Sequence, residues 1–130
     1  MSTRITIIGA GPGGYTAAFE AAKAGAEVTL VESARMGGTC LNCGCIPTKT
    51  LKSSAEALET IRRAAEFGLS GAGDARVDMP AVVARKRKVI ETLRGGLEKT
   101  CARLKVRLVR GRGRVIDASL VEVALDDGLV

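Results

Sequence analysis

The stretch of sequence that decides the fold runs from Arg4 to Tyr15 and reads RITIIGAGPGGY. Its first residues are rich in β-branched side chains and predict a strand over Arg4–Ile8. Glycines then follow in the pattern G-x-G-x-x-G, and an alanine-rich helix is predicted from Tyr15 to Ala24, where Gly25 is suited to end it. The chain therefore passes from strand to glycine turn to helix.

A second predicted strand, Glu27 to Val31, completes a βαβ unit and is followed by the acidic residue Glu32. In such units the first glycine permits a tight turn, the second lets a pyrophosphate approach the backbone, and the third lets the helix pack close to the strand. These roles fall on Gly9, Gly11 and Gly14. Phosphate charge is favoured at the helix N-terminus, and an acid about 20 residues further on accepts hydrogen bonds from ribose hydroxyls. The pattern predicts dinucleotide binding, with Glu32 as that acid.

Two further helices are predicted over Thr48–Glu66 and Met79–Arg103, joined by a glycine-rich loop over Gly68–Asp78. Each helix carries apolar residues at helical spacing, which predicts a buried face. The predicted faces are Leu51, Ala55, Leu58, Ile61 and Ala65 in the first helix, and Ile90, Leu93, Leu97, Cys101 and Leu104 in the second. On this basis Cys101 is a core residue. Glycine costs about 1 kcal/mol against alanine inside a helix, so Gly95-Gly96 predicts a kink or a close contact.

From Val106 onward the apolar period changes to two, which predicts strands. The glycines of Gly111-Arg112-Gly113 are expected to interrupt this pattern, and further strands are expected over Arg114–Ile116 and Leu120–Leu125. Asp127-Gly128 is a strong hairpin-turn signal, yet the returning strand has barely begun when the sequence ends. We therefore expect an incomplete α/β fold, with a parallel sheet flanked by helices and antiparallel strands toward the C-terminus. The sequence is expected to be a fragment of a longer protein.

The amino-acid composition and charge argue against some classes of function. The chain has 20 Lys and Arg against 14 Asp and Glu, and this net charge of +6 would suit phosphates or nucleic acid. Aromatic residues that stack on bases are nearly absent, so we expect a solvated basic surface and no nucleic-acid partner; a basic binding module using Arg103 to Arg114 is kept as an alternative. The sequence contains no apolar run of about 18 residues and no signal peptide, so a cytoplasmic protein without membrane contact is expected.

A second informative stretch, Gly37 to Lys49, reads GGTCLNCGCIPTK and holds three of the four cysteines. Such a cluster indicates a redox disulfide, a metal site or incidental packing. The chain has no histidine, which removes the commonest metal ligand and the commonest general base. A closed metal site requires four ligands, and Cys101 would have to supply one from far along the chain.

Helix geometry constrains which cysteines can pair. Residues three apart in a regular helix have Cα atoms about 5 Å apart, and residues five apart are about 8.6 Å apart. A disulfide tolerates a Cα separation of up to about 6.8 Å. Geometry alone therefore favours Cys40 with Cys43, whereas a bond between Cys40 and Cys45 requires a distorted turn, which Gly44 would allow.

The cysteine stretch resembles the redox-active disulfide motif of the pyridine nucleotide-disulfide oxidoreductases, and its Leu-Asn and Ile-Pro-Thr-Lys flanks are most similar to those of the dihydrolipoamide dehydrogenases. The glycine pattern and Glu32 resemble the FAD-binding start of the same family. The resemblance covers only the N-terminal part of the family's chain. It implies a Rossmann-like FAD/NAD(P)-binding fold, with residues 1–130 as part of the FAD-binding domain and with the NAD-binding and C-terminal interface domains absent.

The resemblance also implies roles for individual residues. Cys40 would exchange with a dithiol substrate, Cys45 would face the flavin, and Lys49 would lie near the flavin ring. FAD would be held by the glycines and by neighbouring residues, and no metal ligand is implied. The implied FAD-binding residues besides Lys49 are Gly9, Gly11, Gly14, Glu32, Gly38, Thr39 and Gly113.

In the complete enzyme, the resemblance implies that electrons pass from a dihydrolipoamide-like dithiol through the disulfide and FAD to NAD. It also implies a homodimer in which the C-terminal domain supplies an acid/base histidine. The lack of histidine agrees with this, so we expect no turnover and at best weak FAD affinity from these residues alone. Cys43 departs from the family pattern, which commonly has valine there, and places a third thiol between the working pair. Mercuric or glutathione reductase-like enzymes, and a small cysteine-rich metal-binding module, are kept as alternatives.

Overall fold

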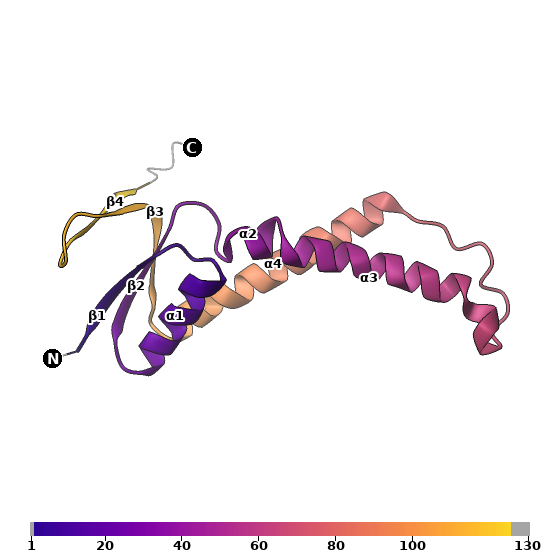
Figure 1. Cartoon of the computed structure of the whole chain (residues 1–130), viewed down its shortest axis with the longest axis horizontal. Coiled ribbons are helices and arrows are strands. Elements are labelled where there is room, and N and C mark those ends of the chain that lie inside the picture. The colour runs from indigo at the N-terminus through magenta and orange to yellow at the C-terminus, as the bar shows by residue number, and fades with distance from the viewer. Residues whose placement is uncertain (1, 126–130) are drawn as a thin grey trace.

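The computed structural model describes residues 2–125, which form a four-stranded sheet with a long helical pair extending from it (Figure 1). The strands lie across the sheet in the order β1 (Arg4–Ile8), β2 (Glu27–Glu32), β3 (Arg107–Val115) and β4 (Val121–Leu125). β1 pairs with β2 and β2 with β3 in parallel, whereas β3 and β4 are antiparallel. The predicted α/β class with antiparallel C-terminal strands is confirmed. The predicted turn at Asp127-Gly128 lies outside the described residues.

Helix α1 (Pro12–Lys23) connects β1 to β2, so the predicted βαβ unit is present. The helix begins three residues before the predicted start, since proline is well suited to the first helical position. One face of the sheet packs against α1 and the C-terminal part of α4 (Met79–Arg103) (Figure 1). The core between these layers is made of small and medium side chains: Ala10, Ala18, Val28, Leu30, Met36, Cys101 and Val106. The predicted core position of Cys101 is confirmed.

The predicted break at Gly111–Gly113 is wrong, because β3 continues through it. The strand instead changes partner there: Arg107–Arg110 pair with β2, and Gly111–Val115 pair with β4. A Cβ atom on Gly111 would lie 2.4 Å from the carbonyl oxygen of Ala124. Glycine therefore lets the strand turn from one pairing to the other without a side chain between them.

The cysteine stretch forms α2 (Gly38–Asn42) and the start of α3 (Cys45–Arg62), followed by the 3-10 helix η1 (Ala64–Phe67). The predicted helix over Thr48–Glu66 thus begins earlier and changes type near its end. The loop over residues 68–78 and the helix Met79–Arg103 are found as predicted. α3 and α4 pack side by side and project away from the sheet (Figure 1).

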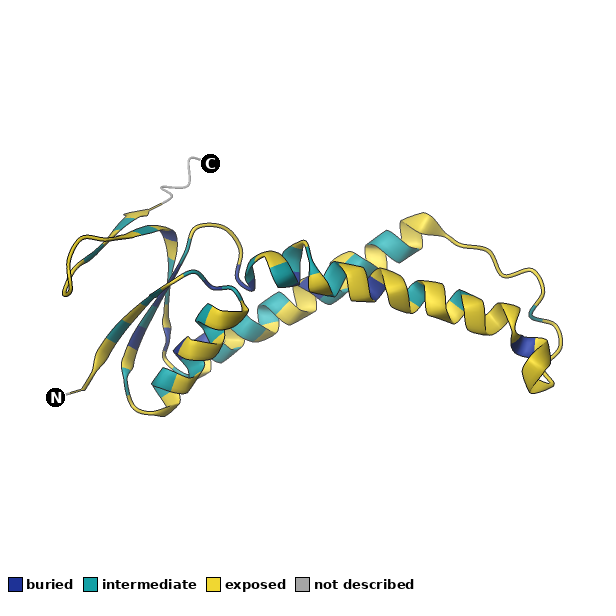
Figure 2. Ribbon diagram, in the orientation of Figure 1, coloured by how far each residue is buried: buried dark blue, intermediate teal, exposed yellow. Residues whose placement is uncertain are grey.

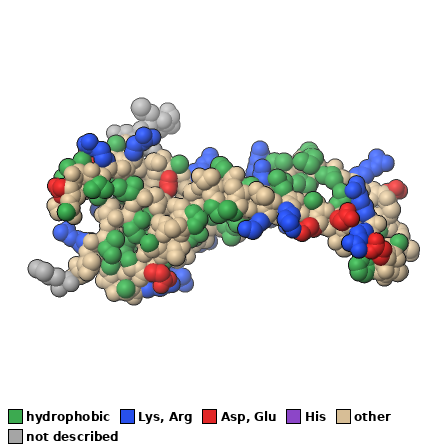
Figure 3. Space-filling view, in the orientation of Figure 1, with side chains coloured by type: hydrophobic (Ala, Val, Ile, Leu, Met, Phe, Trp, Pro, Cys, Tyr) green, Lys and Arg blue, Asp and Glu red, His purple; other side chains and the backbone are tan. Residues whose placement is uncertain are grey.

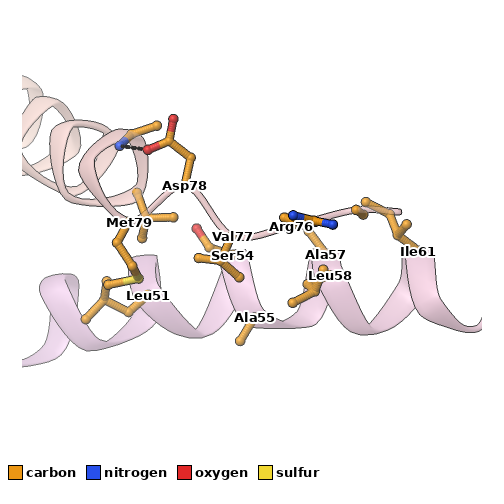
Figure 4. Close-up of a pocket in the computed structure, with 13 residues that line it drawn as sticks. Leu51, Ser54, Ala55, Ala57, Leu58, Ile61, Arg76, Val77, Asp78 and Met79 are labelled. Atoms are coloured by element: carbon orange, nitrogen blue, oxygen red, sulfur yellow. Dashed lines mark hydrogen bonds between the residues drawn. The ribbon is translucent and has the colours of Figure 1, made fainter. Parts of the chain in front are cut away.

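The predicted buried faces of these helices are only partly correct. Ile90 is buried, but Leu51, Ile61 and Leu93 are each at least 40% exposed. The exposed parts of both helices lie beyond the sheet, where no third layer covers them within residues 2–125 (Figure 2). α3 and residues 75–82 line an open apolar groove of about 560 Å³. The side chains of Leu58 and Met79 are part of its lining (Figure 4).

Lysine and arginine side chains are spread over the sheet end and along the helical pair on the face shown in Figure 3, with no single patch. Arg85, within the basic run Arg85–Lys88, donates a hydrogen bond from Nη1 to the carbonyl oxygen of Thr50 at 3.1 Å. One residue of this run thus joins α4 to α3. Within residues 2–125, no helix combines the length and apolar character needed to cross a membrane.

Replacing Gly95 or Gly96 by alanine is expected to stabilise the chain. α4 is uninterrupted there, and a Cβ at either position would meet no described atom within 4 Å, so the predicted close contact is wrong. Each Gly→Ala change is expected to raise the free energy of unfolding by about 0.5–1 kcal/mol, measured by urea denaturation. A loss of stability in either variant would show that the helix needs glycine for another reason.

Candidate functional site

The turn between β1 and α1 is shaped by glycine. Gly9 has a φ of 98°, and its N–H donates to the carbonyl oxygen of Val31 at 2.7 Å. The first N–H bond of α1 runs from Tyr15 to the carbonyl oxygen of Gly11, at 3.0 Å. The N–H groups of Gly13 and Gly14 precede it and point out of the helix N-terminus, as in every α-helix. This helix end therefore favours a negatively charged group.

Glu32 fixes this turn from the end of β2. Its Oε2 atom accepts a hydrogen bond from the N–H of Ala10 at 2.7 Å, and its Oε1 atom accepts one from the N–H of Ala34 at 2.8 Å. Each carboxylate oxygen retains acceptor capacity for a ribose hydroxyl. The sequence indicated the role of Glu32 toward ribose but not its bond to Ala10, because that contact depends on the register of β1 against β2.

The segment before α2 lies directly on the glycine turn. The N–H of Gly37 donates to the carbonyl oxygen of Ala10 at 2.8 Å. Gly38 has a φ of 59°, and a Cβ there would lie 2.7 Å from the Cα of Gly11. Gly9, Gly11, Gly14 and Gly38, which we call the glycine cradle, thus form one side-chain-free surface beside the N-terminus of α1. Such a surface fits a pyrophosphate-containing cofactor held by backbone groups.

Two other predicted cofactor residues occupy different surroundings. Thr39 directly follows the glycine cradle in the first turn of α2, and its side chain is exposed. Gly113 lies on β3, where a Cβ would contact the side chain of Ile8 at 3.1–3.3 Å. Gly113 therefore packs against the last residue of β1, Ile8, which directly precedes Gly9 of the glycine cradle.

A break in the helix brings two cysteines together. α2 ends at Asn42, Cys43 caps it, and α3 begins at Cys45 after Gly44, which has φ −117° and ψ −102°. A Cβ on Gly44 would lie 3.2 Å from the carbonyl oxygen of Thr39. The backbone therefore folds back on α2: a Cβ on Gly44 would also lie 3.4 Å from the Cα of Cys40, and Cys45 follows Gly44 directly.

The electrostatics of Cys40 reflect this contact. A hydrogen bond with the Cys45 side chain raises the pKa of the Cys40 thiol, and partial burial and the charge of Cys45 act in the same direction. A hydrogen bond from the backbone N–H of Cys45 and the positive charge of Lys49, one turn into α3, both lower this pKa. The structure thus brings Cys40, Cys45 and Lys49 together; Cys40 is half-buried, and Cys43 and Cys45 are both exposed. Within residues 2–125, no cluster of three or more His, Cys, Asp or Glu side chains is arranged to hold a metal ion.

Lys49→Met is expected to raise the pKa of the Cys40 thiol further, because the variant removes the cation that stabilises the thiolate. The rate of Cys40 alkylation against pH, read by mass spectrometry, should therefore show its midpoint at higher pH. Lys52→Met is the matched control, since Lys52 lies on the same helix but pairs with Glu56. Equal shifts in both variants, or none in Lys49→Met, would contradict this contribution of Lys49.

Sequence reasoning missed Asn42, which joins three parts of the site. Its Nδ2 atom donates to the carbonyl oxygens of Met36 at 3.1 Å and Gly38 at 2.8 Å. Its Oδ1 atom accepts from Arg94 on α4, from Nε at 3.1 Å and from Nη2 at 2.7 Å. Asn42 thereby ties the loop before α2, and with it the glycine cradle, to the helical pair. No sequence pattern links residues so far apart.

Comparison with known proteins identifies the family. The family model of the pyridine nucleotide-disulphide oxidoreductases matches residues 3–128. The chain belongs to this family. Its enzymes are oxidoreductases that depend on FAD and NAD, which confirms the predicted family and cofactors.

Individual relatives give the same result. The dihydrolipoyl dehydrogenase of Chlamydia muridarum is 45% identical over 117 residues, 90% of this chain and 25% of that protein. That of Geobacillus stearothermophilus is 39% identical over 127 residues, 98% of this chain and 27% of that protein. The crystal structure of LpdA from Mycobacterium tuberculosis matches with a TM-score of 0.84 and 27% identity, over 97% of this chain and 28% of that chain. The chain thus spans about a quarter of the length of these relatives.

Proposed function

We propose that this chain is the FAD-binding, disulfide-carrying part of a flavoprotein that transfers electrons between a dihydrolipoamide-like dithiol and NAD. The observation that carries the proposal is the fold-back at Gly44, which packs against Cys40 and is followed directly by Cys45. This pair begins two residues after Gly38, which is part of the glycine cradle. A redox disulfide beside a pyrophosphate-binding surface is what such a flavoprotein requires.

FAD would be held mainly by backbone groups. The glycine cradle and the N–H groups at the start of α1 would take the pyrophosphate, and Glu32 would accept hydrogen bonds from ribose. Gly38 and Thr39 would lie along the cofactor, Gly113 would line it from β3, and Lys49 would face the flavin ring. When bound, FAD supplies the two-electron chemistry that connects a dithiol to a pyridine nucleotide.

The proposed reaction at the cysteines is thiol-disulfide exchange. A thiolate of the substrate attacks Sγ of Cys40, the Cys40–Cys45 bond breaks, and Cys45 leaves as a thiolate. The second substrate thiol then attacks the mixed disulfide, releasing Cys40 and the oxidised, cyclic substrate. The substrate loses two electrons and the cysteine pair gains them. Lys49 favours the thiolate form at this site.

Activity with NAD is proposed for the longer enzyme, as a cytoplasmic homodimer. The zero histidine count leaves these 130 residues without an imidazole for acid/base catalysis. We therefore expect the 130-residue chain alone to bind FAD weakly and not to reduce NAD. Measurable NAD reduction by this chain with dihydrolipoamide would contradict that expectation.

The test is to oxidise the chain, treat it with a dithiol and count released thiols, with and without added FAD. We expect release of one thiol pair, and with FAD a long-wavelength absorption band from a thiolate next to the flavin. Cys40→Ser should abolish both, and Cys45→Ser should abolish the absorption band, whereas Cys101→Ala, in the core, should abolish neither. Stoichiometric zinc or iron without flavin would favour a metal-binding module. Salt-sensitive DNA binding without FAD binding would favour a basic binding module.

A further inference from the structure

We infer that Cys43 is a third working cysteine, which displaces Cys45 from its bond to Cys40 and forms a second disulfide, Cys40–Cys43. The inference rests on the proposed Cys40–Cys45 disulfide and adds an alternative arrangement of the same oxidised site. Cys40 would then be the shared sulfur of two isomers. Three thiols within one short segment make this exchange intramolecular.

The backbone of α2 places the Cα of Cys43 at a separation from that of Cys40 that a disulfide allows. The N–H of Cys43 donates to the carbonyl oxygen of Thr39 at 2.8 Å, so the helical turn continues as far as Cys43. Residues three apart in such a turn share a face, with Cα atoms about 5 Å apart. This separation is within the range of about 4.4–6.8 Å that a disulfide requires.

The helix break gives Cys40 its other partner. After Gly44 the chain folds back, and the Cys45 side chain reaches Cys40 from the start of α3. Cys40 is therefore flanked by Cys43 at the C-terminal cap of its own helix and by Cys45 at the start of the next one. Cys43 and Cys45 are both exposed, whereas Cys101 is buried in the core at 3% exposure. The exchange is thus confined to the three clustered cysteines.

The exchange step is balanced without an added oxidant. The thiolate of Cys43 attacks Sγ of Cys40, the Cys40–Cys43 bond forms, the Cys40–Cys45 bond breaks, and Cys45 leaves as a thiolate that takes up a proton. One disulfide and one thiol are present before and after the step. Lys49, one helical turn after Cys45, places positive charge near the leaving thiolate.

The second isomer would set the oxidised pair apart from the cofactor. In the proposed function Cys45 is the cysteine that faces the flavin, and in the Cys40–Cys43 isomer it is a free thiol. The oxidising equivalent is then stored between Cys40 of α2 and Cys43 at its C-terminal cap. Return to the Cys40–Cys45 isomer needs only the reverse attack by Cys45, so the Cys40–Cys43 isomer is a reversible resting form.

The test identifies the one thiol left free after oxidation. All three cysteines lie on a single tryptic peptide, Met36 to Lys49. The oxidised monomeric chain is incubated at several pH values, acid-quenched and treated with N-ethylmaleimide, then reduced and treated with iodoacetamide. Fragmentation of the peptide locates each label. We expect maleimide on both Cys43 and Cys45, with faster exchange at higher pH, because the thiolate is the attacking form.

The outcomes separate this inference from the proposed function. Maleimide on Cys43 alone, at every time and pH, overturns the exchange and leaves the Cys40–Cys45 pair intact. Maleimide on Cys45 alone, or on Cys40, overturns the exchange together with the proposed pair. The Cys45→Ser variant is the control for geometry: it should oxidise to Cys40–Cys43 and take no maleimide on this peptide. Maleimide on both remaining cysteines of that variant overturns the exchange.

Discussion

Gly14→Ala is expected to lose about 3 kcal/mol or more of folding free energy and to disrupt the turn that leads into α1. A Cβ at position 14 would lie 1.7 Å from the carbonyl oxygen of Gly9 and 2.9 Å from its carbonyl carbon. These are backbone atoms, and Gly9 is held by the bond from its N–H to Val31. Neither partner can move without separating α1 from β1. Urea denaturation followed by circular dichroism measures the loss.

Gly13→Ala is the matched control for this prediction. Gly13 is adjacent in the same helical turn, but a Cβ there would meet no described atom within 4 Å. This variant is expected to stay within about 1 kcal/mol of the parent chain, because alanine favours the helix. Similar losses in both variants would show that the turn tolerates no side chain for reasons other than contact with Gly9. Parent-like stability of Gly14→Ala would contradict the contact itself.

Asn42→Ala is expected to cost about 2–3 kcal/mol, the second largest effect. The variant removes the donor to the carbonyl oxygens of Met36 and Gly38 and the acceptor for Arg94. The remaining polar groups are partly buried, and without a hydrogen-bond partner each one costs its desolvation free energy. The loop that carries Gly38 onto the glycine cradle also loses its tie to α4. Urea denaturation reports the stability change, and faster alkylation of Cys40 would report loosening of α2.

Two variants divide the roles of Asn42. Asn42→Asp keeps an acceptor for Arg94 but loses the amide donor, whereas Arg94→Met keeps the donor bonds and loses the link to α4. Each is expected to cost less than Asn42→Ala, and Asn42→Asp should have the larger effect on Cys40 alkylation. A loss in Asn42→Ala below about 0.5 kcal/mol would show that water replaces these bonds at little cost.

The local patterns predicted most of the fold. The β-branched run, the glycine turn and the alanine-rich segment at Arg4–Lys23 are short-range features, and the structure has strand, turn and helix there. The apolar faces of the two long helices were less predictable. Periodicity shows which residues share a face but not whether another element covers it, and Leu51 and Leu93 remain exposed. At Gly111 the glycine pattern suggested a break, but the strand changes partner instead, which depends on β2 and β4.

The candidate site divides in the same way. Gly9, Gly11, Gly14 and the cysteines are visible because their spacing is local, and the family resemblance assigned the pair Cys40 and Cys45. Regular helix geometry favoured Cys43 instead, since it does not anticipate the fold-back at Gly44. The bonds from Glu32 to Ala10 and from Arg94 to Asn42 join segments far apart in the chain. Such contacts follow from packing, and a single sequence does not encode them in any readable spacing.

The strand order has a consequence for how the molecule folds. β1, α1 and β2 are contiguous in the chain, whereas β3 reaches β2 only after the cysteine segment and the whole helical pair. Contacts between distant residues form later than local ones, because a long loop must close first. We expect the glycine turn between β1 and α1 to form early and the three cysteines to remain within an unclosed loop until β3 docks. If the chain is oxidised before β3 docks, the cysteines react before their neighbours in the folded structure are in place.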